Sequence, residues 1–245
     1  MAGSQDNAAP GAKGDAVKQA LGVQAADEFV KSGMRIGLGT GSTAIWAIRR
    51  IAEGLAAGRL RDILAVPSSS QSLLAAREGS IPVRSMNDPE IDGALDLVID
   101  GADEFDEARR LTKGGGAALV KEKILAYNAA HVVIIAGASK LVPRLGRSYP
   151  IPVEVIPEAQ VPVERSLRKL GGRPELREAL RKMGPVITDN GNILLDTYFD
   201  GGLDDPRFME GALNGIPGVL GNGIFAGIDP FVLIGEESGE IRRLG

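Results

Sequence analysis

The stretch "GLGTGSTAIWAIRRIA", residues 37–52, spaces three glycines at alternate positions ahead of hydroxyl side chains and an apolar, helix-like run. It overlaps the apolar segment "MRIGL", residues 34–38, so the pattern predicts a strand, a glycine turn and a helix from about Ser42 to Ala57. Glycine lets backbone amides approach a ligand closely, and the positive end of a following helix attracts anions. The stretch therefore predicts an anion-binding turn in an α/β fold.

Predicted strands and helices alternate on both sides of this turn. A helix capped by Asp15 and running to about Ser32 precedes it. Further elements follow the turn, with strands at 62–67, 94–100 and 131–137 and helices after Ser68–Ser70 and after the glycines at 114–116. This alternation predicts a Rossmann-like parallel sheet with helices on both faces. Sites in such sheets form at the carboxyl ends of the strands, so we expect the segments there to converge.

The composition and the pattern of the sequence change after Gly146. Residues 147–164 are rich in proline, and "VITDNGNILLDTYF", residues 186–199, predicts a hairpin that turns at Asn190-Gly191. The apolar "FVLIG", residues 231–235, predicts a late return to the first sheet. We therefore expect a Rossmann-like catalytic domain at 15–146 and 227–245, a smaller α+β domain at 147–226, and a flexible tail at 1–14.

Composition excludes several classes of function. The net charge of -4 gives no basic field for nucleic acid, and no apolar run approaches the ~18 residues of a membrane span. The chain has no cysteine, which excludes disulfides and thiolate chemistry and is typical of a reducing cytosol. A single histidine excludes a zinc triad of histidines. We expect a cytoplasmic protein without a nucleic-acid or membrane partner.

The glycine turn lacks the residues that nucleotide sites require. A dinucleotide fingerprint would have glycine where Ser42 stands and an acid where the next strand ends in Val66-Pro67. A P-loop lysine is absent, and Arg35-Ile36 replaces the acid that precedes a methyltransferase turn. A monophosphate, held by backbone amides and the hydroxyls of this turn, remains. The alternative is a tight connection that binds nothing.

Two later segments supply charge at strand ends. "VIDGADEFD", residues 98–106, puts carboxylates directly after a buried strand, where they could move hydroxyl protons, bind a metal or form a solvated turn. "TKGGGAALVKEKI", residues 112–124, offers Lys113 and the amides of Gly114–Gly116 to an oxyanion. By spacing alone, Glu122 between two lysines is an exposed surface charge.

Eight sequence blocks in order resemble ribose-5-phosphate isomerase, type A, over nearly the whole chain from about Lys18. They are "GTGSTA", "DGADE", "KGGGAAL", "EKI", "ASK", "VEVIP", "LGGRPE" and "TDNGN". The resemblance implies interconversion of ribose 5-phosphate and ribulose 5-phosphate through a cis-enediolate, without metal or organic cofactor. It also implies a homodimer or homotetramer whose ligand is a small sugar phosphate.

Matching motif positions carry the family's roles to this chain. Glu122 becomes the base, which replaces its interpretation as a surface charge. Asp100, Asp103 and Lys113 become the other catalytic positions, with Asp100 assisting ring opening and Lys113 stabilising the enediolate. The implied substrate-binding positions are Lys18, Thr40, Gly41, Ser42, Thr43, Gly101, Ala102, Gly114, Gly115, Gly116 and Lys140.

Three segments depart from the family pattern: the tail before Lys18, Leu176–Pro185 and "FAGIDPF" at residues 225–231. We expect all three to lie away from the site. Other functions on related architectures fit less well. An amino-sugar-phosphate deaminase would rely on a histidine, whereas His131 begins a predicted strand. A non-catalytic sensor would lack the charged set, and a coenzyme A transferase would be larger.

Overall fold

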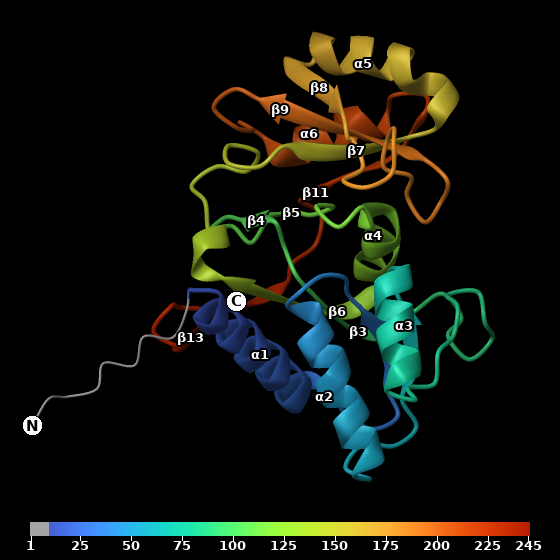
Figure 1. Ribbon diagram of the computed structural model, residues 1–245, viewed down its shortest axis with the longest axis vertical. Helices are drawn as coiled ribbons and strands as arrows, with labels where there is room; N and C mark the ends of the chain where they lie inside the picture. The colour runs from blue at the N-terminus through green and yellow to red at the C-terminus, as the bar shows by residue number, and fades with distance from the viewer. Residues whose placement is uncertain (1–9) are drawn as a thin grey trace, which may run out of the picture.

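A computed structural model describes residues 10–245, which form three β-sheets flanked by helices (Figure 1). The α-helices are α1 (Pro10–Phe29), α2 (Ala44–Ala56), α3 (Ser70–Glu78), α4 (Leu119–Tyr127), α5 (Gln160–Lys169) and α6 (Pro206–Asn214). The 3-10 helices are η1 (Ala138–Lys140) and η2 (Pro157–Ala159). The strands are β1 (Arg35–Leu38), β2 (Leu64–Pro67), β3 (Leu95–Asp100), β4 (Glu104–Phe105), β5 (Leu111–Thr112), β6 (Ala129–Gly137), β7 (Ile151–Val155), β8 (Gly172–Leu176), β9 (Ile193–Phe199), β10 (Val219–Asn222), β11 (Ile224–Phe225), β12 (Phe231–Gly235) and β13 (Ile241–Leu244).

The largest sheet has six strands in the order β13-β12-β6-β3-β1-β2. All neighbours pair in parallel except β12 and β13. The strand predicted at 231–235 lies beside β6, so the end of the chain does return to the first sheet. The predicted α/β fold with a mostly parallel central sheet is confirmed, and the turn after β1 follows the strand that lies between β3 and the edge strand β2.

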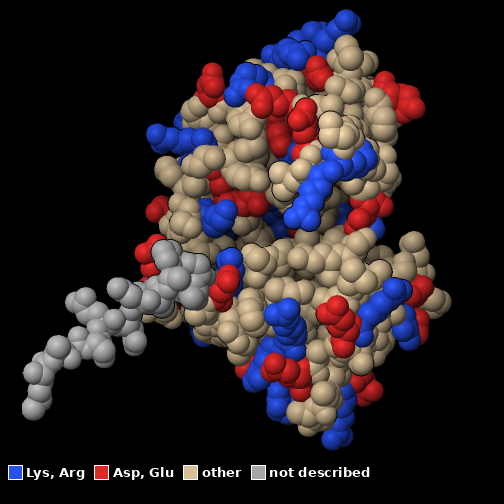
Figure 2. Space-filling model, viewed as in Figure 1, with Lys and Arg blue, Asp and Glu red and all other residues tan. Residues whose placement is uncertain are grey.

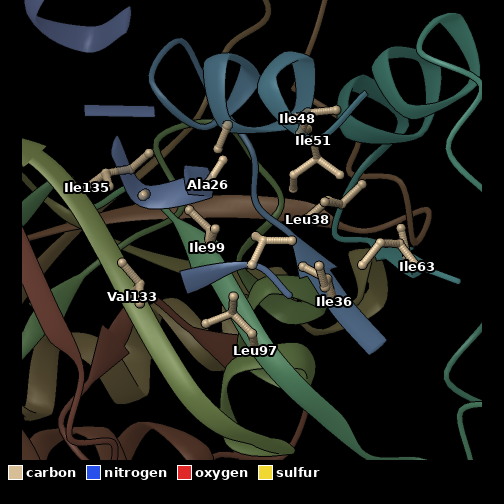
Figure 3. Packing of buried hydrophobic residues seen from close by; sticks show 14 of the residues in the cluster. Ala26, Ile36, Leu38, Ile48, Ile51, Ile63, Leu97, Ile99, Val133 and Ile135 are labelled. Carbon is tan, nitrogen blue, oxygen red and sulfur yellow. The ribbon is translucent and has the colours of Figure 1, made fainter. Parts of the chain in front are cut away.

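Helices α1 and α2 cover one face of this sheet (Figures 1 and 3). Helix α2 buries Ala44, Ala47, Ile48 and Ile51, whose i, i+3, i+4, i+7 spacing forms one apolar stripe. This stripe packs on alternate strand residues such as Ile36 and others in the same cluster. Each fully buried branched side chain contributes roughly 1.5–3 kcal/mol of transfer free energy. The packing of α2 on β1 is thereby stabilised, and it holds the glycine turn that joins these two elements.

The opposite face of the sheet packs against α4 and a three-stranded antiparallel sheet of order β11-β5-β4. Leu125 of α4 and Phe105, Leu111 and Phe225 of the small strands are buried there with Val98 of the large sheet. This packing holds the start of α4 close to the strand ends.

A four-stranded antiparallel sheet, β10-β7-β9-β8, lies at one end of the molecule with α5 and α6 (Figure 1). It has a hydrophobic cluster of its own, which includes Val153, Val163, Leu195 and Leu213. Figure 2 shows acidic and basic side chains interspersed over one face of the molecule, as the net charge of -4 leads one to expect.

One local prediction, the start of the first helix, is wrong, and the start of the helix predicted from about Ser42 is shifted by two residues. Helix α1 begins at Pro10 instead of Asp15, because proline has a helical φ and needs no hydrogen bond in a first turn. The predicted tail is therefore helical over 10–14, and its residues 1–9 lie outside the described residues. Helix α2 begins at Ala44, two residues later than predicted.

The predicted hairpin at Asn190-Gly191 forms only its turn. The segment before the turn is not a strand of a hairpin, and β9 pairs with β7 and β8 instead. The reason is tertiary: the buried Glu154 carboxylate on β7 accepts hydrogen bonds from Thr188, Asn190 and Asn192 at 2.8–2.9 Å. These bonds hold the arm as a loop. Across residues 10–245, no helix has the length and apolar character needed to cross a membrane.

Candidate active site

The turn after β1 joins the carboxyl ends of three neighbouring strands. Its Thr40 Oγ1 lies 2.7 Å from the Oγ atoms of both Ser68 and Ser69, which follow β2. The Thr40 N–H donates to Asp100 Oδ1 at the end of β3 at 3.0 Å. The convergence expected from the parallel sheet is thus present, and hydrogen bonds fix it.

The second glycine of the turn is required by the close approach of Asp100. A Cβ atom at Gly39 would overlap the Asp100 carboxylate. Asp100 Oδ1 accepts the N–H groups of Thr40 and Gly101, and Oδ2 lies 2.9 Å from Lys113 Nζ. Asp100 is therefore buried with both oxygens occupied, and it anchors the turn as well as Lys113.

Lys113 is the centre of the charged cluster. Its buried ammonium donates to the Gly101 carbonyl at 2.6 Å, to Asp100 at 2.9 Å and to Glu122 Oε1 at 3.2 Å. Burial by itself would lower the pKa of Lys113, but the two facing carboxylates outweigh it and raise that pKa above its ordinary value. Lys113 stays protonated, with three donors and three acceptors matched.

Glu122 is buried and incompletely satisfied. Its side chain is 5% exposed, Oε1 faces Lys113, and Oε2 has no hydrogen-bond partner. Burial raises the pKa of Glu122 to about 8, with Asp100 and Asp103 adding to the rise and Lys113 opposing it. The interpretation of this residue as a surface charge is wrong. The signal that could have found it is spacing, because Glu122 lies on the buried stripe with Leu119 and Leu125.

The glycine loop between β5 and α4 is held by Asp103. The Gly115 N–H donates to Asp103 Oδ2 at 2.7 Å, and the Ala117 N–H closes the turn on the Gly114 carbonyl at 3.0 Å. Gly114 has a φ of +107°, and a Cβ atom there would meet Leu119 at 2.9 Å. The loop therefore requires glycine for both conformation and space.

These segments line one cleft of about 1020 Å³. All the predicted site residues line it except Asp100, which is buried: Lys18, Thr40, Gly41, Ser42, Thr43, Gly101, Ala102, Asp103, Lys113, Gly114, Gly115, Gly116, Glu122 and Lys140. Lys140 comes from η1 after β6, and Lys18 comes from α1, where it pairs with Asp15 at 3.3 Å. The structure thus brings together residues that lie more than 100 positions apart in the sequence.

The cleft also includes residues that the sequence analysis missed. Glu236, Glu240 and Arg242, from the hairpin of β12 and β13, also line it. Gln71 accepts the Gly41 N–H at 2.8 Å. No motif marks these positions, because only the return of the chain to the first sheet brings the hairpin beside α1. The described residues contain no group of three metal-ligating side chains arranged to hold a metal ion.

The expectation that three departing segments lie away from the site is wrong. Gly14 and Val17, before Lys18, line the cleft. Arg177 donates to the carbonyls of Gly114 and Gly115 at 2.9 and 3.3 Å. Phe225 of "FAGIDPF" places its ring 5.8 Å from Lys113 Nζ. Each segment joins the site through tertiary packing that sequence spacing does not encode.

Comparison with known families identifies the family to which the chain belongs. A sequence model of the family Ribose 5-phosphate isomerase A (phosphoriboisomerase A) matches residues 64–239, which include the acidic loop, the glycine loop and α4. The chain belongs to the ribose 5-phosphate isomerase A family. The resemblance identified from the motifs is confirmed, and the chain is therefore an isomerase.

Individual members of the ribose 5-phosphate isomerase A family resemble the chain over most of its length. Ribose-5-phosphate isomerase A of Trichodesmium erythraeum is 46% identical over 220 residues, covering 90% of this chain and 91% of the relative. The solved ribose 5-phosphate isomerase A of Methanocaldococcus jannaschii has a TM-score of 0.86 and 40% identity, covering 93% of this chain and 97% of that one. A solved D-ribose-5-phosphate isomerase in complex with phospho-erythronic acid has a TM-score of 0.87 and 42% identity, with the same coverage.

Proposed function

We propose that the chain interconverts ribose 5-phosphate and ribulose 5-phosphate through a cis-enediolate, with Glu122 as the base. The observation that carries the proposal is the state of this one carboxylate: it is buried in the cleft wall, and Oε2 has no partner. Burial raises its pKa to about 8, which makes it basic enough to take a proton from a carbon beside a carbonyl at near-neutral pH.

The proton moves between two adjacent carbons of the open-chain sugar. Glu122 removes the C2 proton of the aldose, the electron pair forms a C1–C2 double bond, and negative charge develops on the C1 oxygen. Glu122 then gives the proton to C1 while the C2 hydroxyl becomes the ketose carbonyl. We assign the transfer of the hydroxyl proton from O2 to O1 to Asp103, because its carboxylate lines the cleft and the Gly115 N–H fixes it at 2.7 Å.

We assign to Lys113 the stabilisation of the negative charge that develops on the enediolate oxygen. All three of its donors are occupied when Glu122 is ionised. Once Glu122 takes up the C2 proton, its attraction for Lys113 weakens and one ammonium donor becomes available to the enediolate. A preorganised donor of this kind typically contributes about 3 kcal/mol to the transition state.

Asp100 is assigned an effect on ring opening that acts through Lys113. Lys113 lines the cleft and Asp100 does not, while Asp100 Oδ2 contacts the ammonium at 2.9 Å. In ring opening the bond from C1 to the ring oxygen breaks and the proton of the C1 hydroxyl passes to that oxygen. Lys113 would donate a hydrogen bond to the ring oxygen during this step, while Asp100 holds the ammonium in place. Asp100 is therefore a positioning residue in this proposal.

The phosphate of the sugar is proposed to bind at the turn after β1. Residues 40–43 precede the N-terminus of α2, whose Thr43 makes no capping bond with its side chain. Helix amides, the hydroxyls and the cations Lys18 and Lys140 at the cleft suit a dianion. The related structure solved with phospho-erythronic acid supports this class of ligand, and we propose that the cleft binds the same compound.

The test is isomerisation in deuterated water with a chelator present. Purified enzyme is incubated with ribose 5-phosphate and EDTA, and both ketose and deuterium at C1 of ribulose 5-phosphate are followed. We expect ketose that carries C1 deuterium. Ketose without any deuterium would contradict an exchanging base, and loss of activity with EDTA would contradict catalysis without metal. Glu53→Gln is the control for Glu122→Gln in this assay, because Glu53 is 63% exposed on α2.

We also propose that the enzyme is cytoplasmic and forms a homodimer or homotetramer. Absence of cysteine and the properties of the family support these proposals. Light scattering on the purified chain measures the mass, and a mass of one chain at micromolar concentration would contradict the assembly.

A further inference from the structure

Arg177 reaches the glycine loop from the four-stranded sheet. It follows β8 directly, and its Nε donates to Asp196 Oδ2 on the neighbouring strand β9 at 2.8 Å. Its Nη2 donates to Asp196 Oδ1, so the guanidinium and the carboxylate form a two-point fork. Both side chains are largely buried, at 13% and 18% exposed. The remaining nitrogen, Nη1, is thereby aimed at the glycine loop.

That nitrogen contacts the backbone of the loop. Nη1 donates to the Gly114 carbonyl at 2.9 Å and to the Gly115 carbonyl at 3.3 Å. The Gly115 N–H, on the other side of the first of these peptide planes, donates to Asp103 at 2.7 Å. One peptide unit is therefore held at its carbonyl by Arg177 and at its N–H by Asp103.

Planarity carries this constraint to the next amide. A trans peptide directs its N–H opposite to its carbonyl, so holding the Gly115 carbonyl on Arg177 directs the Gly116 N–H away from it. Gly116 lines the cleft. Three successive glycines give the backbone its greatest conformational freedom, because no side chain restricts it. The buried fork between Arg177 and Asp196 restricts this loop instead.

We propose that Arg177 is a positioning residue for the isomerisation, which fixes the Gly114–Gly116 loop so that its amides and Asp103 meet the enediolate. This rests on the proposed function of the cleft. The residue touches neither the cleft nor the reacting carbons. It acts through the loop, and it comes from the segment of the sequence that departs from the family pattern. A lysine at this position keeps the charge but lacks the planar guanidinium that binds Asp196 at two points and aims a further nitrogen at the loop.

The test compares variants of two arginines at the ends of one strand. Arg177→Met removes the fork, and Arg177→Lys keeps only the charge. The matched control is Arg173→Met, because Arg173 lies on β8, is 62% exposed and pairs with Glu175 away from the loop. For each variant kcat and KM with ribose 5-phosphate, the inhibition constant of inorganic phosphate and the thermal midpoint are measured.

We expect kcat of Arg177→Met to fall ~100-fold, since displacement of a reacting group by about 1 Å costs this much. KM and the phosphate inhibition constant should stay within about threefold of the parent, and Arg177→Lys should recover only part of kcat. Arg173→Met should match the parent.

Equal activity of Arg177→Met and the parent would overturn the inference. So would a loss of kcat accompanied by an equal loss of phosphate binding, because that pattern indicates general disruption. If Arg177→Met does not fold, Arg177→Lys decides between the same outcomes. Absence of isomerisation in the parent itself would instead refute the proposed function.

Discussion

Helix α4 carries two buried ion pairs on adjacent residues, and they differ in how far they are satisfied. Glu122 pairs with Lys113 at 3.2 Å and leaves Oε2 without a partner. Lys123 pairs with Glu210 of α6 at 2.6 Å, and Tyr127 and the Ala226 N–H occupy the remaining acceptors of Glu210. Consecutive helical residues point about 100° apart, so the first pair faces the cleft and the second joins α4 to α6.

The difference separates a pair that stabilises the fold from the pair that we propose to react. In the second pair each charged group has hydrogen-bond partners, and such bonds offset the desolvation penalty of a buried ion pair. In the first pair burial leaves one carboxylate oxygen uncompensated, and the cost appears as a raised pKa. A base needs an oxygen that can accept a proton, and the incomplete pair, which lines the cleft, is therefore the one that we propose to react.

The largest expected effect is on the rate, from Glu122→Gln. The amide keeps the shape but cannot accept the C2 proton, so we expect kcat to fall by about 10³-fold or more. The measurement is ketose formation at saturating ribose 5-phosphate. A variant within tenfold of the parent would show that another group moves the proton.

The matched change in the second pair, Glu210→Gln, should affect stability instead. Lys123 would lose its charged partner while buried, and breaking such a pair costs about 3 kcal/mol of the free energy of unfolding. Urea unfolding measures this loss, and kcat of the folded variant should stay within about threefold. A large loss of kcat at unchanged stability would contradict the division between the two pairs.

The pH dependence should reveal the incomplete pair. Because Glu122 must be ionised to accept a proton, kcat/KM should rise about tenfold per pH unit up to about 8 and then level. A limb near pH 6 would report the substrate phosphate, whose second pKa lies there, and would refute the assignment.

The same pKa also gives the sign for stability. Folding raises the pKa of Glu122 from 4.5 to about 8, so its contribution to folding is greatest below pH 4.5 and is lost as pH rises through 8. We therefore expect the free energy of unfolding of Glu122→Gln, relative to that of the parent, to increase between pH 4.5 and pH 8. Urea unfolding at pH 5 and pH 8 measures it, and an opposite trend would mean that Lys113 stabilises the ionised form.

The smallest effect is expected for Lys140→Met. This partly exposed cation has no reacting role in the proposal, and loss of one phosphate contact should raise KM about fivefold with kcat within twofold. Lys31→Met is the control, because Lys31 is exposed after α1, outside the cleft. An unchanged KM would place the phosphate elsewhere in the cleft.

Much of the fold could be predicted because the central sheet is specified locally. Buried strands such as β3 are apolar on both faces, and the glycine turn has a spacing that only a strand-to-helix connection uses. The predictions failed where a distant group decided the structure. The segment before Asn190 forms a loop because its polar side chains donate hydrogen bonds to Glu154, which lies more than 30 residues earlier in the chain.

The sequence by itself determined which residue types were available: glycines where the backbone must approach Asp100, and carboxylates and a lysine directly after strands. The tertiary structure decided which of these carboxylates has the burial and the unpaired oxygen that we propose for the base. Glu122 and Lys123 are adjacent charged residues in the sequence, yet Glu122 lines the cleft with one buried oxygen unpaired, whereas Lys123 belongs to a completed hydrogen-bond network. The proposed reactivity depends on desolvation and on missing hydrogen-bond partners, and both are set by packing between segments far apart in the chain.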